Sequence, residues 1–259
     1  YKILLLGDSC IDVYNYGTRD RLNPEAPVPV FKQSSSLQKP GMAANVQQNL
    51  LSFSSQIKLI SNNKADLTKE RFIDQKTNQH LLRVDKGETI PLSPIDIENI
   101  EYDLYDALVI SDYDKGTLPY DVCKEVSQKC AHHETLLFVD SKKNDLSCFE
   151  GAIIKINEKE YLECIKFPDH KELIVTLGGA GAVWNNQFIE SEKADVFDVC
   201  GAGDTFFAGL IQRYLETKDL KDSIMFGNLC AAITVSKTGA HYLTLEEVRN
   251  VREKQRTKK

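Results

Sequence analysis

A glycine-rich turn that ends in an acid lies near the C-terminal end of the chain, in the stretch DVCGAGDTFFAGL from Asp198 to Leu210. Successive backbone N–H groups at a helix start can point at one anion, and the helix dipole adds positive potential there. Gly201 and Gly203 would let a large anion approach the backbone closely. Asp204 could then accept a proton from a hydroxyl that attacks this anion, or it could simply cap the helix. These residues alone do not decide between the two.

The segments that must position this turn alternate between strand and helix patterns. Short apolar runs without polar alternation are typical of strands buried on both faces of a parallel sheet. Such runs occupy residues 2–7, 107–111, 135–140, 152–156 and 172–177. Helices are predicted at residues 119–131, 157–165, 203–216, 221–237 and 244–255. This order predicts a single α/β domain over residues 1–259 with a mostly parallel sheet.

Two stretches depart from the alternation. Prolines flank β-forming residues at 26–35, which suits an edge strand, and apolar and polar residues alternate at 78–88, as in a half-exposed strand. We interpret them as parts of a small β-flap contributed by residues 13–38 and 71–90. In an open α/β sheet the ligand crevice lies beyond the carboxyl ends of the strands, where such a flap could exclude water.

Other glycine-rich signals are weaker. The stretch GGAGAV at residues 178–183 superficially resembles a dinucleotide-binding fingerprint, but it follows a late strand. The residues after it predict a hairpin with Asn185 and Asn186 at the turn. Neither a P-loop nor a protein-kinase motif occurs in the chain.

Composition restricts the class of partner. The chain has 259 residues, a formal net charge of −6 and an ordinary share of hydrophobic residues, so a sizeable core is expected. Nucleic-acid binding, which calls for a basic surface, is not expected. Seven cysteines are spread singly without a C-x-x-C pair, a pattern typical of reduced thiols in the cytoplasm. No apolar run approaches the ~18–20 residues needed to span a bilayer, so a membrane partner is not expected.

Taken with other motifs, the stretch from Asp198 resembles the C-terminal signature of the ribokinase-like carbohydrate kinases, the PfkB family. Segments similar to further family landmarks follow in the expected order over nearly the whole chain: GDSCID, PGMAAN, INEKE, VTLGGAG and AAITVSKTGA. The resemblance implies a ribokinase-like three-layer α/β/α fold with a mostly parallel sheet and a small β-flap as lid. It also implies an ATP-dependent sugar kinase that requires Mg²⁺.

Several segments are similar to the branch of this family that phosphorylates D-glycero-β-D-manno-heptose 7-phosphate: LNPEAPVPVF, KPGMAANVQQNL, NQHLLRVD, ISDYDKGTL and VDSKKND. For this branch the expected acceptor is the C1 hydroxyl and the product is the 1,7-bisphosphate, which serves lipopolysaccharide-type heptose synthesis. The implied partners are therefore a sugar phosphate and ATP. A homodimer formed through the flap is a hypothesis that the resemblance raises.

The resemblance also assigns roles around the transferring phosphate. Asp204 matches the catalytic base, and the residues before it match the anion hole, namely Gly201, Ala202 and Gly203. Asn157 and Glu160 match an N-x-x-E element that organises Mg²⁺ largely through water, which suits a cation that keeps several waters. Asn157 is also a good N-cap, so a purely structural role for this pair stays open.

On the sugar side, Asp12 and Asn45 match ligands of sugar hydroxyls, and Gly41 permits close approach of the substrate. Asp8 could instead orient the loop beside Asp12. Arg83 is our candidate for gripping the phosphate of the substrate, with Lys39 and Arg21 as alternatives.

On the nucleotide side, a T-x-G-x-x-G element is expected beside the ATP phosphates, and Lys142 is expected to reach toward them. The matching residues are Thr176, Gly178 and Gly181, with Asn228 and Gly239 in segments that resemble the adenine pocket. Asp198 and the carbonyl of Cys200 correspond to a monovalent-cation loop, so activation by K⁺ is a hypothesis.

Two departures from the family pattern bear on the substrate. Met42 stands where the family normally has a second glycine, and residues 61–77 span a region that is shorter than in typical relatives. A helix and a strand of the core or flap are candidates for the missing part. Two alternatives therefore stay open: a kinase for another sugar or sugar phosphate, and a catalytically weak sugar-binding or regulatory homologue.

Overall fold

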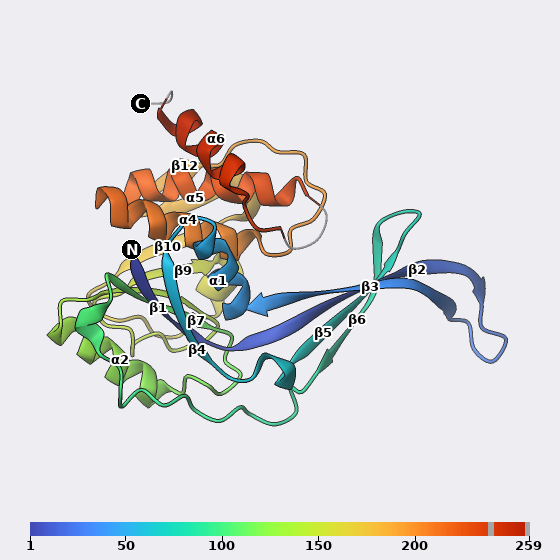
Figure 1. Cartoon of the computed structure of the whole chain (residues 1–259), viewed down its shortest axis with the longest axis horizontal. Helices are drawn as coiled ribbons and strands as arrows, with labels where there is room; N and C mark the ends of the chain where they lie inside the picture. The colour runs from blue at the N-terminus through green and yellow to red at the C-terminus, as the bar shows by residue number, and fades with distance from the viewer. Residues whose placement is uncertain (238–240, 257–259) are drawn as a thin grey trace.

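The structure is a computed structural model that describes residues 1–237 and 241–256 (Figure 1). An eight-stranded sheet forms its centre, in the order β12-β11-β10-β9-β8-β7-β1-β4. The strands from β10 to β4 are all parallel. Their bounds are β1 (Lys2–Gly7), β4 (Gln56–Ser61), β7 (Ala107–Asp112), β8 (Leu136–Ser141), β9 (Ile153–Asn157) and β10 (Glu172–Thr176). The mostly parallel sheet predicted from the apolar runs is confirmed.

Helices cover both faces of this sheet, which gives the expected three layers. One face carries α2 (Tyr120–His132), and the other carries α1 (Ala43–Leu51), α4 (Ala202–Thr217), α5 (Leu220–Val235) and α6 (Leu245–Arg256) (Figure 1). Alternate residues of β1 show why the strand is apolar throughout. Ile3 and Leu5 pack with the cluster under α4 and α5, whereas Leu4 and Leu6 pack with the cluster under α2.

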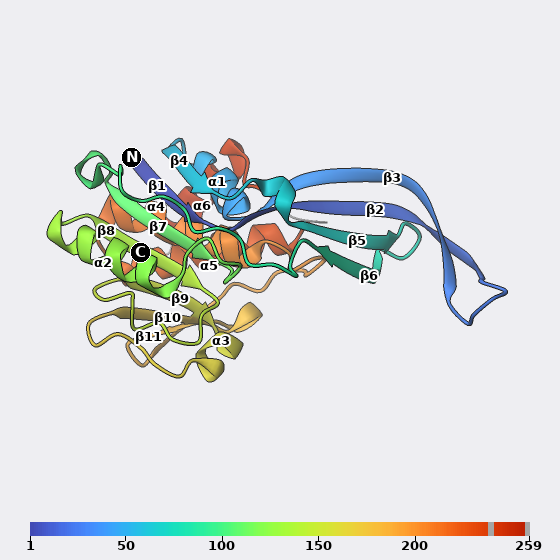
Figure 2. The same cartoon turned by 90° about the horizontal axis from the view of Figure 1, so that it is seen from below.

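The β-flap is a separate four-stranded sheet in the order β3-β2-β5-β6, and it projects from one side of the molecule (Figures 1 and 2). Its strands are β2 (Ser9–Leu22), β3 (Pro29–Met42), β5 (Thr68–Asp74) and β6 (Gln79–Lys86). The flap therefore reaches closer to the central sheet than the bounds 13–38 and 71–90 suggested. The two stretches interpreted as edge or half-exposed strands, 26–35 and 78–88, overlap its edge strands β3 and β6.

The shortened region between β4 and the flap contains a single 3₁₀ turn, η1 (Lys64–Asp66), before β5 begins at Thr68. Asn63 caps this turn by accepting a hydrogen bond from Ala65 N. All residues of this connection are described, and none of them is α-helical. This region thus contains a 3₁₀ turn and the flap strand β5 but no α-helix. Which elements it lacks relative to typical relatives stays a prediction.

The hairpin predicted at Asn185 and Asn186 is present. Asn185 and Asn186 both have positive φ, and they join β11 (Gly181–Trp184) to β12 (Gln187–Glu190) in an antiparallel hairpin at the sheet edge. All seven cysteines lie in the described residues and are free. Among the same residues, none of the helices has the length and apolar character needed to cross a bilayer.

Candidate active site

The glycine-rich turn forms the N-terminus of α4 and points at the carboxyl edge of the central sheet. Gly201 is the N-cap of the helix, and its φ of 78° lies in the left-handed region that favours glycine. Gly203 is exposed in the first turn, where N–H groups have no acceptor within the helix. A Cβ atom on Gly203 would lie 3.3 Å from Lys155 Nζ. Backbone donors and an ammonium group therefore meet at one place, as an anion hole requires.

Asp204 lies in the first turn of α4 but does not cap it, because no side chain makes a capping hydrogen bond at this end. Its carboxylate instead accepts hydrogen bonds from Asn45 Nδ2 at 2.5 Å and from the Tyr113 hydroxyl at 3.2 Å. Burial raises the pKa of Asp204 to about 6, with the Asn45 hydrogen bond opposing the shift and nearby Asp140 adding to it. A carboxylate with a pKa near 6 suits a general base at neutral pH.

Two lysines bring positive charge to the cavity side of Asp204. Lys155 is buried and donates to Asp140 Oδ2 at 2.6 Å, and Lys142 contacts Glu160. Burial alone would raise the pKa of Asp140, but Lys155 and Lys142 outweigh it and lower that pKa. Asp140 is therefore ionised, and it holds Lys155 beside the glycine-rich turn.

The pair Asn157 and Glu160 forms a capping box at the start of α3 (Glu158–Glu163). Asn157 Oδ1 accepts from Glu160 N at 2.9 Å, and Glu160 Oε2 accepts from Asn157 N at 2.8 Å. Glu160 Oε1 contacts Lys142 on the cavity side. The structural role that the sequence left open is thus present, and a role in organising Mg²⁺ stays a prediction.

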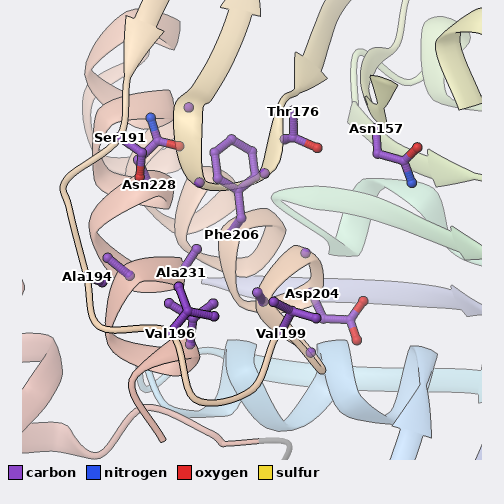
Figure 3. Close-up of a pocket in the computed structure, with 18 of the residues that line it drawn as sticks. Asn157, Thr176, Ser191, Ala194, Val196, Val199, Asp204, Phe206, Asn228 and Ala231 are labelled. Atoms are coloured by element: carbon purple, nitrogen blue, oxygen red, sulfur yellow. The ribbon is translucent and has the colours of Figure 1, made fainter. Parts of the chain in front are cut away.

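A cavity of about 700 Å³ opens between α4, α5, the β11–β12 hairpin and the loop after β12 (Figure 3). Asp204 and Asn157 lie at one side of the cavity (Figure 3). Phe206, Asn228 and Ala231 line the part that is farther from these two residues (Figure 3). The cavity contains most of the residues predicted for the nucleotide: Lys142, Asn157, Thr176, Gly178, Gly181 and Asn228. Gly239 lies outside the described residues.

The loop from Ser191 to Val199 closes the cavity on its outer side and carries apolar side chains there (Figure 3). Val196 and Val199 are 62% and 68% exposed. A flat apolar ligand between this loop and Ala231 would cover them. Asn228 Nδ2 donates weakly to Ile189 O at 3.4 Å, so this amide also ties α5 to the β12 strand.

The residues predicted to bind the sugar lie on the side of Asp204 away from the cavity, at the base of the flap. Asp12 is buried and accepts from Arg71 Nη1 at 2.5 Å. A Cβ atom on Gly41 would lie 2.3 Å from Asp12 Oδ2, so any larger residue here would have to displace this carboxylate. Asn45 contacts Asp204 directly. Asp12 and Gly41 thus lie side by side at the base of the flap, and Asn45 lies in the first turn of α1, against Asp204. A role for these three residues with sugar hydroxyls stays a prediction.

The loop before α4 faces this sugar side. Asp198 Oδ1 accepts from Cys200 N at 2.9 Å. Burial raises the pKa of Cys200 to about 11; Asp198 and the flap residue Asp12 add to this rise, and Arg71 opposes it. The predicted cation loop is thus close to the flap, and its role with K⁺ stays a prediction.

Arg83 is not part of this cluster. Its guanidinium pairs with Asp85 on the same strand, at 2.9 and 3.0 Å, and its side chain is 57% exposed. It does share a face of the flap with Arg71, because the two residues are directly opposite in the β5–β6 ladder. A role for Arg83 with a substrate phosphate remains a prediction.

Four residues of the site were missed from sequence: Arg71, Tyr113, Asp140 and Lys155. Asp140 is the last residue of a predicted strand, and Lys155 lies within another. A charged residue in an apolar run indicates a functional site, because burying a charge is costly. Arg71 and Tyr113 carried no such signal, because their partners Asp12 and Asp204 are far away in the chain.

A comparison with family models matches residues 116–247 to the pfkB family of carbohydrate kinases. Among curated proteins, the chain is 33% identical to the bifunctional protein HldE of a Nitratiruptor species and 30% identical to that of a Helicobacter pylori strain, each over 95% of this chain. The chain spans 64% and 65% of these relatives' lengths. The first alignment covers 304 positions, more than this chain contains, so the relative has residues in the aligned region that this chain lacks.

Solved structures show the same fold at low identity. Phosphofructokinase-2 from Escherichia coli, in complex with substrates and products, superposes with a TM-score of 0.74 and 14% identity, covering 99% of this chain and 100% of that one. Arabidopsis thaliana ribokinase, complexed with ribose and ATP, gives 0.70 and 13%, covering 96% and 97%. These two likenesses confirm the ribokinase-like fold.

Proposed function

Because this chain belongs to the pfkB family of carbohydrate kinases, we propose that it transfers the γ-phosphate of ATP to a hydroxyl group of a sugar phosphate. The observation that carries this proposal is the position of Asp204. Its buried carboxylate stands between the cavity on one side and Asp12, Asn45 and the flap on the other. A base at this point can reach an acceptor hydroxyl and the transferring phosphate together.

The cavity accounts for the nucleotide in this proposal. The base of ATP would lie against the apolar part near Phe206 and Ala231, under the loop that carries Val196. Its phosphates would extend toward the α4 N-terminus and the ammonium groups of Lys142 and Lys155. Asn157 lines the cavity, and Glu160 Oε1 contacts Lys142, which also lines it. These oxygens would suit a Mg²⁺ ion that is held through water. When bound, Mg²⁺ would neutralise charge on the phosphates.

The reaction itself follows from the groups around Asp204. The acceptor hydroxyl gives its proton to the Asp204 carboxylate as its oxygen attacks the γ-phosphorus in line. The bond between the γ-phosphorus and the bridging oxygen breaks, and ADP leaves. N–H groups of Gly203 and its neighbours, with Lys155, stabilise the charge on the equatorial oxygens. The proton on Asp204 is lost to solvent after the product departs.

The flap supports a phosphorylated acceptor. Cross-strand pairs place Lys39, Asp12 and Lys69 in one row across β3, β2 and β5. Arg71 and Arg83 lie two residues further along on the same face. Four cations face Asp12 and Asp85 here, and Lys69 also contacts Glu88 at 3.9 Å. The cations still outnumber these three carboxylates, which suits an anionic sugar. Together with the motifs shared with the heptose branch, this favours C1 of D-glycero-β-D-manno-heptose 7-phosphate as the acceptor, giving the 1,7-bisphosphate. A different sugar phosphate is the second candidate, because Met42 replaces a glycine of the usual pattern beside Gly41.

The test of the kinase proposal is ADP release measured across a panel of sugars and sugar phosphates with MgATP. Wild-type protein should respond to at least one sugar phosphate, and Asp204→Asn should lose about a hundredfold or more of kcat. Asp121→Asn is the matched control, since Asp121 is an exposed acid in the first turn of α2. Binding of sugars without stimulated ADP release would instead support the regulatory homologue. A better response to another sugar would change only the substrate assignment.

A second measurement tests the role of the flap face. Arg83→Met should raise KM for the sugar phosphate several-fold and leave KM for the corresponding free sugar unchanged. Lys86→Met is the matched control, because Lys86 lies on the opposite face of β6. Equal effects of the two substitutions would remove Arg83 from the substrate site.

A further inference from the structure

Four chain crossings join the flap to the central sheet, and each contributes one side chain to a small apolar cluster. Cys10 comes from the start of β2, Met42 from the end of β3, Leu67 from the residue before β5 and Leu92 from the segment after β6. Tyr113, which follows β7, packs against them. We call these five residues the junction cluster. The whole connection between flap and sheet therefore converges on one place.

Met42 holds an unusual backbone conformation inside this cluster. Its φ of 57° and ψ of −132° lie in a region that residues with a Cβ atom rarely adopt. Such a conformation persists only where its surroundings enforce it. The Met42 side chain is 4% exposed, so its burial in the junction cluster offsets the unfavourable backbone. A glycine would adopt this backbone without cost but would leave the cluster unfilled.

The helix start at Met42 and the junction cluster each provide one hydrogen-bond donor to the proposed catalytic base. Met42 is the N-cap of α1, and Asn45 in the first turn of this helix donates to Asp204 Oδ2 at 2.5 Å. Tyr113 of the junction cluster donates from its hydroxyl to Asp204 Oδ1 at 3.2 Å. The backbone of Tyr113 is fixed in turn, because its N–H donates to Asp8 Oδ2 at 2.8 Å. Both hydrogen-bond donors to the base thus depend on the place where Met42 lies.

We propose that Met42 is a positioning residue that couples the flap to the catalytic base. By filling the junction cluster and fixing the start of α1, it holds Tyr113 and Asn45 on the two oxygens of Asp204. The position of the flap, which carries residues proposed to bind the sugar, depends on the same cluster. This inference rests on the proposed kinase function for its kinetic readout.

Three substitutions separate the side chain from the backbone strain. Met42→Leu keeps a large apolar side chain and should retain wild-type kinetics within about threefold. Met42→Ala and Met42→Gly both empty the cluster and should lower kcat about tenfold or more, with a higher KM for the sugar acceptor. KM for ATP should change least, because Tyr113 is the single member of the junction cluster that lines the nucleotide cavity. Met225→Ala, which truncates the other methionine of the chain on α5, is the matched control and should leave both KM values unchanged.

The glycine variant gives the sharpest test. Since glycine relieves the strained backbone, Met42→Gly should melt at a temperature no lower than Met42→Ala and yet remain slow. Combining it with Tyr113→Phe should add little further loss of kcat, because both changes release the same contact to Asp204. Wild-type kcat and acceptor KM in Met42→Gly would overturn the proposal, as would fully additive losses in the double variant.

Hydrogen exchange gives a readout that does not need activity. Met42→Gly should exchange the amides at the flap base, in β2 and β3 near Cys10 and Gly41, faster than Met42→Leu does. Unchanged exchange in Met42→Gly would also contradict the coupling. If wild-type protein releases no ADP with any sugar, the kinase proposal fails, and the exchange comparison still tests the role of Met42 separately.

Discussion

At the residue scale, the proposed reaction depends on the ionisation of Asp204. Burial first raises its pKa to about 6, Asn45 and the two lysines lower it, and Asp140 adds to the rise. Only the ionised carboxylate can accept the acceptor's proton. We therefore expect kcat/KM to fall below about pH 6, approaching a tenfold loss per pH unit, when the rate is measured from pH 5 to 8.

Substitutions of two neighbours of Asp204 should shift the acidic limb of the pH–rate profile in opposite directions. Tyr113→Phe removes a hydrogen bond that stabilises the ionised form, so the limb should shift to higher pH. Asp140→Asn removes a nearby negative charge, so the limb should shift to lower pH. Shifts of both variants in the same direction, or no shift in either, would argue against Asp204 as the titrating base.

The same raised pKa has a consequence for stability. The folded state binds the Asp204 proton more tightly than the unfolded chain, whose carboxyl has a pKa near 3.8. Stability from this group is thus fully present below about pH 4 and is lost as the pH rises through about 6, by about 3 kcal/mol at most. Asp204→Asn should therefore raise the melting temperature at pH 8 and have little effect at pH 4. A lower melting temperature at pH 8 would contradict this account.

At the element scale, the short helix α3 combines a structural and a proposed catalytic task. Asn157→Ala removes the N-cap and should cost about 1 kcal/mol of unfolding free energy. Glu160→Gln retains an oxygen for the Asn157 N–H but loses the charge that faces Lys142. We expect Glu160→Gln to keep its stability and to need several-fold more Mg²⁺ for half-maximal activity. An unchanged Mg²⁺ requirement in Glu160→Gln would leave the pair with a capping role alone.

At the scale of the whole molecule, the sequence predicted what local chain geometry determines. The strand and helix order, the Asn185–Asn186 hairpin and the position of the GAGD turn at a helix start all depend on residues within one turn or strand of each other. Asp204 and Asn45 are 159 residues apart. The family resemblance assigned a separate role to each of them, and their contact was not predicted. Arg71 and Tyr113 were not predicted. Their places in the site depend on the cross-strand register of the flap and on the packing at its base, and residues nearby in the sequence indicate neither of these.

The flap also bears on assembly, since the resemblance suggests a homodimer through it. Leu22, Leu37 and Leu82 are 67%, 46% and 59% exposed on the flap strands, and burying such side chains favours association. We expect sedimentation velocity to show a species of about twice the 29.2 kDa chain mass, with the dimer fraction rising with concentration.

Leu82→Lys should shift this equilibrium to monomer, because a charge buried at the interface is costly. Leu104→Lys, at a similarly exposed leucine outside the flap, should not shift it. A wild-type protein that stays monomeric at all concentrations would remove the dimer hypothesis and leave each flap to serve its own active site.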